Sequence, residues 1–209
     1  MLRTIALILV ALITANAQTV EPVKVESRPI SVGLVVDNSG SYRLLLDRVI
    51  DLVADIVDLK SGDDEMFLVT FVDTDKIVLR QPLTHVKTKL HDAADEMFIE
   101  GGPTAILDAL LFSAKELGNA PPERAKALLL ISDGDERGSA AKTGDVIRAL
   151  KDARIRVYTI GIADDRLNTK LLERIAKETG GVTFIPKTRS ETDAMIKQVW
   201  TAMRSLSSE

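Results

Sequence analysis

Hard oxygen ligands gather in three short segments of this 209-residue chain: DNSGS at residues 37–41, GGPT at 101–104 and DGD at 133–135. In the first segment, side chains at every second position can point to one side as the chain passes from an extended path into a turn. They supply one carboxylate, from Asp37, and two hydroxyls, from Ser39 and Ser41. Carboxylate and hydroxyl oxygens without sulfur or imidazole suit Mg²⁺, Mn²⁺ or Ca²⁺. The pattern therefore favours a site for a divalent cation.

The elements that must position these segments are short apolar runs that alternate with amphipathic stretches. Strands are predicted at residues 30–36, 66–72, 127–132, 156–161 and 182–185, with a short hairpin partner at 76–80. Helices are predicted at 42–59, 86–97, 105–117, 142–153, 170–179 and 191–205. The first helix has its apolar residues on one face, and the strand run at 128–131 is apolar without alternation, as a central parallel strand should be.

Strands that alternate with helices of ten or more residues predict a single α/β domain over residues 30–205. Its sheet is doubly wound and mostly parallel, with helices on both faces. In such sheets, ligands bind beyond the carboxyl ends of the strands, where the winding reverses. The three oxygen-rich segments are expected to meet there.

At this point the sequence resembles the von Willebrand factor type A domain family and its metal-ion-dependent adhesion site. The family motif is D-x-S-x-S, a distant Thr and a distant Asp, and the matching residues here are Asp37, Ser39, Ser41, Thr104 and Asp133. The likeness covers residues 30–205 and points in particular to an exported bacterial subgroup with a Rossmann-like fold. The string D-x-S-x-S alone is short, so the likeness depends on all three segments.

The resemblance implies a role for each of the five residues. The three hydroxyls would hold the metal, and the two carboxylates would bind it directly or through water. One open octahedral position would accept an acidic side chain or a C-terminal carboxylate of a partner protein, which is binding rather than turnover. The chain departs from many relatives at Tyr42, where Met is common, and at Pro103, which stands before the Thr and restricts the loop.

Two other functions remain open on the residues alone. The first is a Mg²⁺-dependent hydrolase with Asp37 as nucleophile, although Ser39 stands where such enzymes usually carry a second carboxylate. The second is a structural assembly subunit with a vestigial metal site. Residues 37–41 could also be only a polar turn that caps the following helix.

Several other polar residues are candidates with simpler interpretations. Asp108 either orients the second segment or is a solvated helix residue, and Asp135 fits an ordinary turn better than a role at the site. His85 and His91 are expected to be exposed and receive no role. Trp200 is expected to pack on the core.

Composition excludes further classes. Lys and Arg total 27 against 31 Asp and Glu, a net charge of -4, so no basic excess points to a nucleic-acid partner. The absence of Cys excludes disulfides, thiolate catalysis and Cys-ligated zinc. An aromatic content of 4% disfavours an aromatic-lined cofactor pocket.

The N-terminus is typical of a secretory signal peptide over residues 1–17. Arg3 gives the positive start, residues 5–13 are an unbroken apolar run, and Ala15-Asn16-Ala17 is a small-x-small cleavage site. The run is too short to span a bilayer, and no other stretch is long enough. The chain is therefore expected to be secreted or periplasmic after cleavage near Ala17, with a leader arm at 18–29 and a tail at 206–209.

Overall fold

The computed structural model describes residues 29–164 and 166–205. The predicted signal peptide, the leader arm as far as residue 28 and the tail lie outside these residues, so they stay predictions. Within the described ranges, no helix combines the length and the apolar character needed to cross a membrane.

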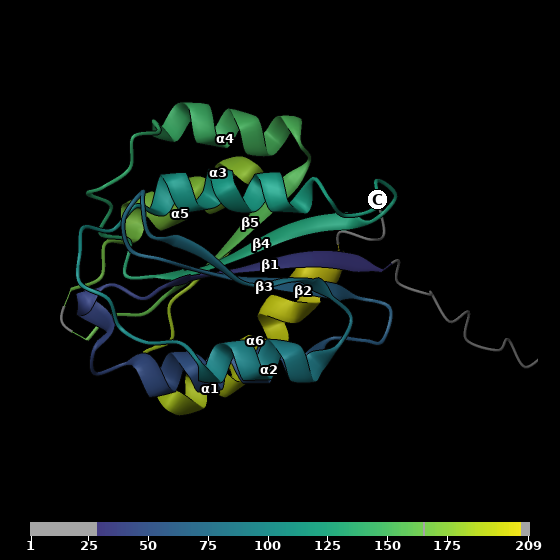
Figure 1. Ribbon diagram of the computed structural model, residues 1–209, viewed down its shortest axis with the longest axis horizontal. Helices are drawn as coiled ribbons and strands as arrows, with labels where there is room; N and C mark the ends of the chain where they lie inside the picture. Colours follow the sequence, from purple (N-terminus) through teal and green to yellow (C-terminus); the bar gives the residue numbers. More distant parts are fainter. Residues whose placement is uncertain (1–28, 165, 206–209) are drawn as a thin grey trace, which may run out of the picture.

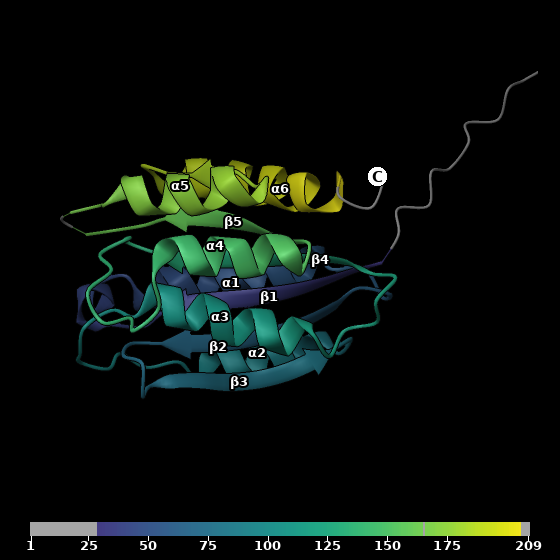
Figure 2. The same cartoon turned by 90° about the horizontal axis from the view of Figure 1, so that it is seen from above.

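A six-stranded sheet with the order β3-β2-β1-β4-β5-β6 forms the centre of the fold. Figure 2 labels its first five strands, from β3 to β5. Its strands are β1 (Ile30–Asp37), β2 (Glu65–Phe71), β3 (Ile77–Thr84), β4 (Ala125–Ser132), β5 (Ile155–Gly161) and β6 (Thr183–Phe184). Neighbouring strands are parallel except for β3, which is antiparallel to β2. The predicted fold class is therefore confirmed, and the winding reverses between β1 and β4.

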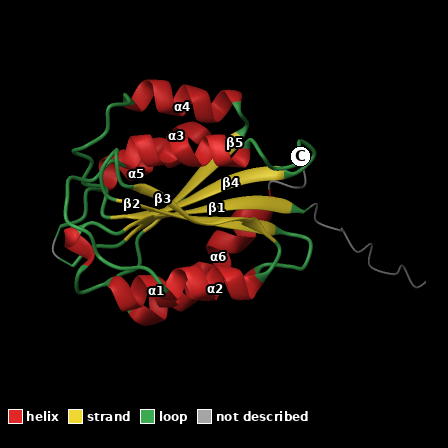
Figure 3. Ribbon diagram, viewed as in Figure 1, coloured by secondary structure: helices red, strands yellow, loops and turns green. Residues whose placement is uncertain are grey.

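Helices cover both faces of the sheet. They are α1 (Leu46–Leu59), α2 (Lys87–Asp95), α3 (Ile106–Leu117), α4 (Thr143–Asp152), α5 (Thr169–Thr179) and α6 (Arg189–Arg204). Helices α1, α2 and α6 lie on one face, and α3, α4 and α5 lie on the other (Figures 1 and 3). This arrangement buries β1 completely, which explains why Leu34, Val35 and Val36 are apolar without alternation.

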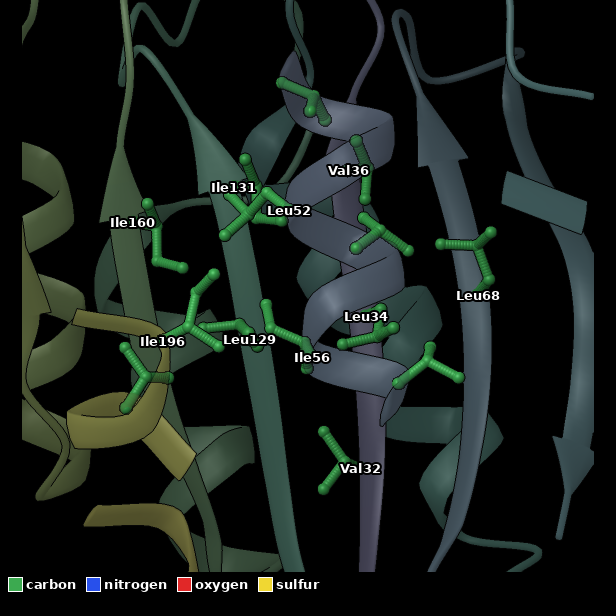
Figure 4. Close-up of a cluster of buried hydrophobic side chains, with 14 of the residues drawn as sticks. Val32, Leu34, Val36, Leu52, Ile56, Leu68, Leu129, Ile131, Ile160 and Ile196 are labelled. Carbon is green, nitrogen blue, oxygen red and sulfur yellow. The ribbon is translucent and has the colours of Figure 1, made fainter. Parts of the chain in front are cut away.

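Each face of the sheet has its own apolar core. On the α1 side, Val32, Leu34 and Val36 of β1 pack with Leu52 and Ile56 of α1 (Figure 4). The alternate residue Val35 points to the other face, into a cluster formed with α3, α4 and α5. The two cores hold β1 from both sides and so fix the position of the residue that ends it.

Several predicted boundaries were wrong. The helix predicted from residue 42 begins at Leu46, because a 3-10 turn over Gly40–Tyr42 precedes it. The hairpin partner predicted at 76–80 runs on to Thr84, since the ladder with β2 continues through bulges and an edge strand tolerates Pro82. The last strand is only two residues long.

The predictions for His85, His91 and Trp200 can also be compared with the fold. His91 is half-buried rather than exposed, and its Nε2 lies 3.1 Å from an Asp58 oxygen. His85 is exposed, as expected. Trp200 packs in the α1-side core, also as expected.

Candidate metal centre

The predicted site lies at the carboxyl edge of the sheet, where β1 and β4 end side by side. The register pairs Val36 of β1 with Ile131 of β4, so the next residues, Asp37 and Ser132, are neighbours. Asp133 follows immediately. The loops after both strands gather at the left end of the sheet in Figure 1. This edge is also the point of winding reversal, the usual ligand position in such sheets.

Asp37 is 1% exposed, and each of its carboxylate oxygens accepts a hydrogen bond. The Ser39 N–H donates to Oδ1 at 3.0 Å, and the Ser132 hydroxyl donates to Oδ2 at 2.9 Å. The Ser132 hydroxyl itself accepts from the Gly134 N–H at 3.0 Å. Ser132 therefore links the first and third segments, a role that the sequence did not predict.

The two serine hydroxyls of the first segment lie together. Ser39 Oγ is 3.1 Å from Ser41 Oγ, and Ser39 is buried whereas Ser41 is exposed. The Tyr42 N–H donates to the Ser39 carbonyl at 3.0 Å, which forms the 3-10 turn that turns the chain back. The turn thus brings alternate hydroxyls to one place, one at the base and one at the rim.

Asn38 braces the first segment from the other side. It is 1% exposed, and its side-chain Nδ2 donates to the Phe98 carbonyl at 2.9 Å. Its main-chain carbonyl accepts from the Glu100 N–H at 2.9 Å. Asn38 therefore holds the first segment against the loop that leads to the second. Sequence reasoning missed this contribution.

Thr104, in the second segment, is 6% exposed and is fixed through the main chain. Its carbonyl accepts from the N–H groups of Arg137 at 2.9 Å and Gly138 at 3.0 Å. The next N–H, of Ala105, donates to the Val72 carbonyl beyond β2 at 2.8 Å. Thr104 thus lies at the same edge of the sheet, tied to the third loop and to the strand end beside β1.

The start of α3 and the third loop are joined by acidic side chains. The Asp108 carboxylate accepts from the N–H groups of Ala140 at 2.8 Å and Ala141 at 2.9 Å, and from the Thr74 hydroxyl at 2.7 Å. Glu136 accepts from the Leu107 N–H at 3.0 Å. Of the two interpretations of Asp108, these contacts favour the one in which it orients the loops.

Gly134 lets the third loop turn directly after Asp133. Its φ is +78°, and a Cβ at this position would lie 2.1 Å from the Asn168 carbonyl oxygen. The Asn168 N–H donates to the Asp133 carbonyl at 2.7 Å. The close approach therefore requires glycine. Asp135 forms the expected turn, since its N–H donates to Asp133 Oδ1 at 2.9 Å and its carboxylate pairs with Arg137.

The electrostatics of the site are dominated by unneutralised carboxylates. Burial raises the pKa of Asp37 from 3.8 to about 7, and the nearby charge of Asp133 adds to the increase, against the hydrogen bonds from Ser39 and Ser132. Burial and the same two carboxylates raise the pKa of Tyr42, whose hydroxyl donates to the Ile162 carbonyl at 2.9 Å. No basic side chain in the described ranges forms an ion pair with Asp37 or Asp133.

The available ligands are two carboxylates and three hydroxyls. No group of three or more His, Cys, Asp or Glu side chains within residues 29–164 and 166–205 could hold a metal ion. A metal here would therefore depend on the hydroxyls of Ser39, Ser41 and Thr104 as much as on Asp37 and Asp133. Oxygen ligands of this kind fit a hard divalent cation and fit soft metals poorly.

Comparison with known proteins gives one family. Residues 31–198 match the sequence profile of the von Willebrand factor type A domain. The chain is 23% identical to mouse inter-alpha-trypsin inhibitor heavy chain H2 and 22% identical to the human protein, in each case over 193 residues. These alignments include 86% of this chain but 20% of each relative, so the chain spans about a fifth of their length.

Two solved structures from bacteria have a similar fold. An aerotolerance-related membrane protein from Bacteroides fragilis has a TM-score of 0.71 at 18% identity, with 84% of this chain and 99% of that chain covered. A von Willebrand factor type A protein from Catenulispora acidiphila has a TM-score of 0.74 at 17% identity, with 85% and 43% covered. At these identities the likeness supports the fold alone.

Proposed function

The chain belongs to the von Willebrand factor type A domain family, whose members are typically protein-interaction modules, and on this premise we propose a metal-dependent adhesion function. The protein is an exported module that binds a divalent cation, Mg²⁺ or else Mn²⁺ or Ca²⁺, at the edge of the sheet. The bound cation attracts an acidic side chain or a C-terminal carboxylate of a partner protein. The module performs binding and no turnover.

The observation that carries this proposal is the pair of buried carboxylates, neither of which forms an ion pair with a described basic residue. Asp37 and Asp133 are 1% and 5% exposed, and the charge of Asp133 adds to the raised pKa of Asp37. A buried charge is costly unless it is paired or coordinates a metal. The exposed Arg137 interacts electrostatically with Asp133 but forms its ion pair with Asp135, so a cation from solution is the group that would neutralise the buried pair.

The hydroxyl and carboxylate ligands would have different roles at the metal site. Ser39, Ser41 and Thr104 would supply neutral oxygens, and the two aspartates would supply the negative charge, directly or through water. When bound, the divalent ion supplies positive charge and an open coordination position. Two aspartate charges balance the ion without excess, so an incoming carboxylate is not repelled.

The surface around the site is suited to a partner. Ser41 is exposed at the rim, and so are the loop residues Gly101, Gly102 and Pro103. Leu44, in the same loop as the serines, is 77% exposed. A protein partner that presents a carboxylate beside an apolar side chain could contact both features. The site therefore opens on a surface that is partly apolar.

The hydrolase alternative receives less support from the contacts of Asp37. A nucleophilic carboxylate needs an oxygen that can reach a substrate. Both oxygens of Asp37 already accept hydrogen bonds, from Ser39 and Ser132, and the side chain is buried. These contacts suit a residue that organises a cation site better than one that attacks a substrate.

Thermal unfolding of the full chain tests the metal site. We expect Mg²⁺, Mn²⁺ or Ca²⁺ to raise the Tm above its value in chelator by about 5–10 °C, because a ligand at 100 times its Kd adds about 2.7 kcal/mol. Asp37→Ala and Thr104→Ala should abolish the rise. Ser113→Ala is the matched control, since it removes a buried hydroxyl from α3 away from the site. A rise that survives in Asp37→Ala would contradict the proposal.

Export is tested separately by the mature N-terminus. In a bacterial host, we expect protein recovered from the periplasm or the medium to begin near Gln18, because cleavage should follow Ala17. Intact-mass measurement gives the terminus directly. Full-length protein found only in the cytosol would contradict the export part of the proposal and leave the metal part standing.

A further inference from the structure

A groove of about 860 Å³ opens at the other edge of the sheet, where β4 and β5 begin. Its walls come from the chain before and at the start of β4, the connection from α4 into β5, and the end of α5. β4 has eight residues, so the groove lies about 23 Å from the candidate metal centre. Figure 1 shows the two edges at opposite ends of the fold. The volume is within the range of ligand sites.

The groove is strongly basic although the chain is acidic overall. Eight charged residues line it, and two of them, Glu123 and Glu178, are acidic. The six basic residues are Arg124, Lys126, Lys151, Arg154, Arg156 and Lys177. Glu178 is engaged by Arg174 at 2.8 Å on α5. The groove therefore concentrates positive charge in a chain whose net charge is -4.

Ordinary structural roles account for some of these residues. Lys151 and Lys177 lie in the last turns of α4 and α5, where cations complement the helix dipole. Arg124 donates to the Asp63 carbonyl at 2.6 Å and lies 3.8 Å from Glu65. Lys126 and Arg154 form no ion pair with any described residue, and Arg154 is exposed. These two need another explanation.

Arg154 is the most informative of the six. It has a φ of 55°, and no other described residue apart from glycine has a positive φ. Helix α5 ends beside the same groove in a similar left-handed turn, with Gly180 at a φ of 81°. Glycine makes that turn without steric cost, whereas arginine does not. The end of α4 thus keeps a strained cation where α5 has the unstrained residue.

We propose that this groove binds an acidic segment of a polypeptide through its carboxylates. Arginine guanidinium groups match carboxylates with two parallel hydrogen bonds. The groove is recessed, so a flat bilayer would not reach its base. None of its lining residues is aromatic, which removes the stacking that single-stranded nucleic acid uses. A long polyanion would also meet the acidic remainder of the surface.

The test measures fluorescence anisotropy of a labelled glutamate-rich peptide with the full chain in chelator, so that a metal-held carboxylate cannot contribute. We expect binding that weakens as salt rises, and no binding of the matching glutamine-rich peptide. Arg154→Gly should weaken binding about tenfold, because it removes a charge-assisted contact. Its Tm should equal or exceed that of the parent chain, because the strain is relieved.

Two further variants separate charge from fold. Arg154→Lys keeps the charge but loses the two parallel hydrogen bonds of the guanidinium, so its affinity should fall between those of the parent chain and Arg154→Gly. Arg148→Ala removes an exposed arginine from α4 outside the groove and should leave binding unchanged. Arg154→Gly that binds like the parent would overturn the proposal, and so would equal binding of the glutamine peptide. Tighter binding of single-stranded DNA or anionic vesicles would overturn it in favour of those ligands.

Discussion

The substitution Asp37→Asn probes the charge that the metal-free protein carries at the edge of its sheet. Burial raises the pKa of Asp37 to about 7 in the folded chain, against an ordinary value of 3.8. This difference corresponds to about 4 kcal/mol. Because the folded state binds this proton more tightly than the unfolded state, protonation of Asp37 stabilises the fold at low pH. This stabilisation is lost as pH rises from about 4 to about 7. The metal-free wild type therefore becomes less stable over this range.

Asparagine has nearly the same shape and carries no charge. Its carbonyl oxygen can still accept from the Ser39 N–H. In chelator, the free energy of unfolding of Asp37→Asn relative to wild type should therefore rise with pH. The difference in free energy of unfolding between Asp37→Asn and wild type should grow by about 4 kcal/mol in favour of the variant between about pH 4 and about pH 8. With Mg²⁺ at about 100 times its Kd, only the wild type gains stability, by about 2.7 kcal/mol, so the advantage of Asp37→Asn near pH 8 should shrink to about 1 kcal/mol.

Urea unfolding followed by tryptophan fluorescence measures the effect. The chain has one tryptophan, Trp200, which is 9% exposed in the core on α6, so its emission reports loss of the fold. Asp135→Asn is the control, because it removes a charge from the same edge at a side chain that is 43% exposed. A difference between Asp37→Asn and wild type that stays constant with pH would refute the reasoning from buried charge.

Two further predictions concern other parts of the fold. Burial opposes ionisation of Asp64, but local hydrogen bonds and the charge of Arg204, 2.6 Å away, outweigh it and lower the pKa. The free energy of unfolding should therefore fall as pH drops below about 4. Asp64→Asn should lower it by about 3 kcal/mol at neutral pH and remove most of its dependence on pH below about 4. Thermal melts at a series of pH values would show both effects. Gly134→Ala should lower the free energy of unfolding by about 2 kcal/mol and weaken Mg²⁺ binding, because its Cβ would meet the Asn168 carbonyl. Gly144→Ala is the control: it has open space around it and should leave both the Tm and the Mg²⁺ titration unchanged.

The order of strands and helices could be predicted because burial leaves a simple trace in the sequence. The run Leu128–Ile131 is apolar at every position, which is typical of a strand covered on both faces. The start of α1 could not be predicted in the same way. Tyr42 is apolar and buried, so it matches the helical pattern, yet its hydroxyl bonds to Ile162 and its main chain forms a 3-10 turn. Periodicity alone does not distinguish these cases.

Some residues of the candidate site could likewise be predicted from the sequence, and others could not. Asp37 and Asp133 could be singled out because each follows a predicted strand, and parallel strands end at the same edge. Ser132 could not, because only the register that pairs β1 with β4 brings its hydroxyl to Asp37. Asn38 and Asp108 likewise act through carbonyl and N–H groups far along the chain. Whether the five predicted ligands hold a metal stays a prediction.

The central position of β1 also determines the order in which parts of the site become available during synthesis. Asp37 belongs to the first strand, but the hydroxyl that holds it comes 95 residues later, and the Tyr42 hydroxyl reaches a carbonyl 120 residues later. At about 5–20 residues per second, a ribosome takes roughly 5–20 s to supply the first of these partners. Until β4 has emerged and docked, the edge lacks one of its two acidic loops. A chain that ends before β4 therefore lacks part of the proposed site, and cation binding would report that β4 has been made and has docked beside β1.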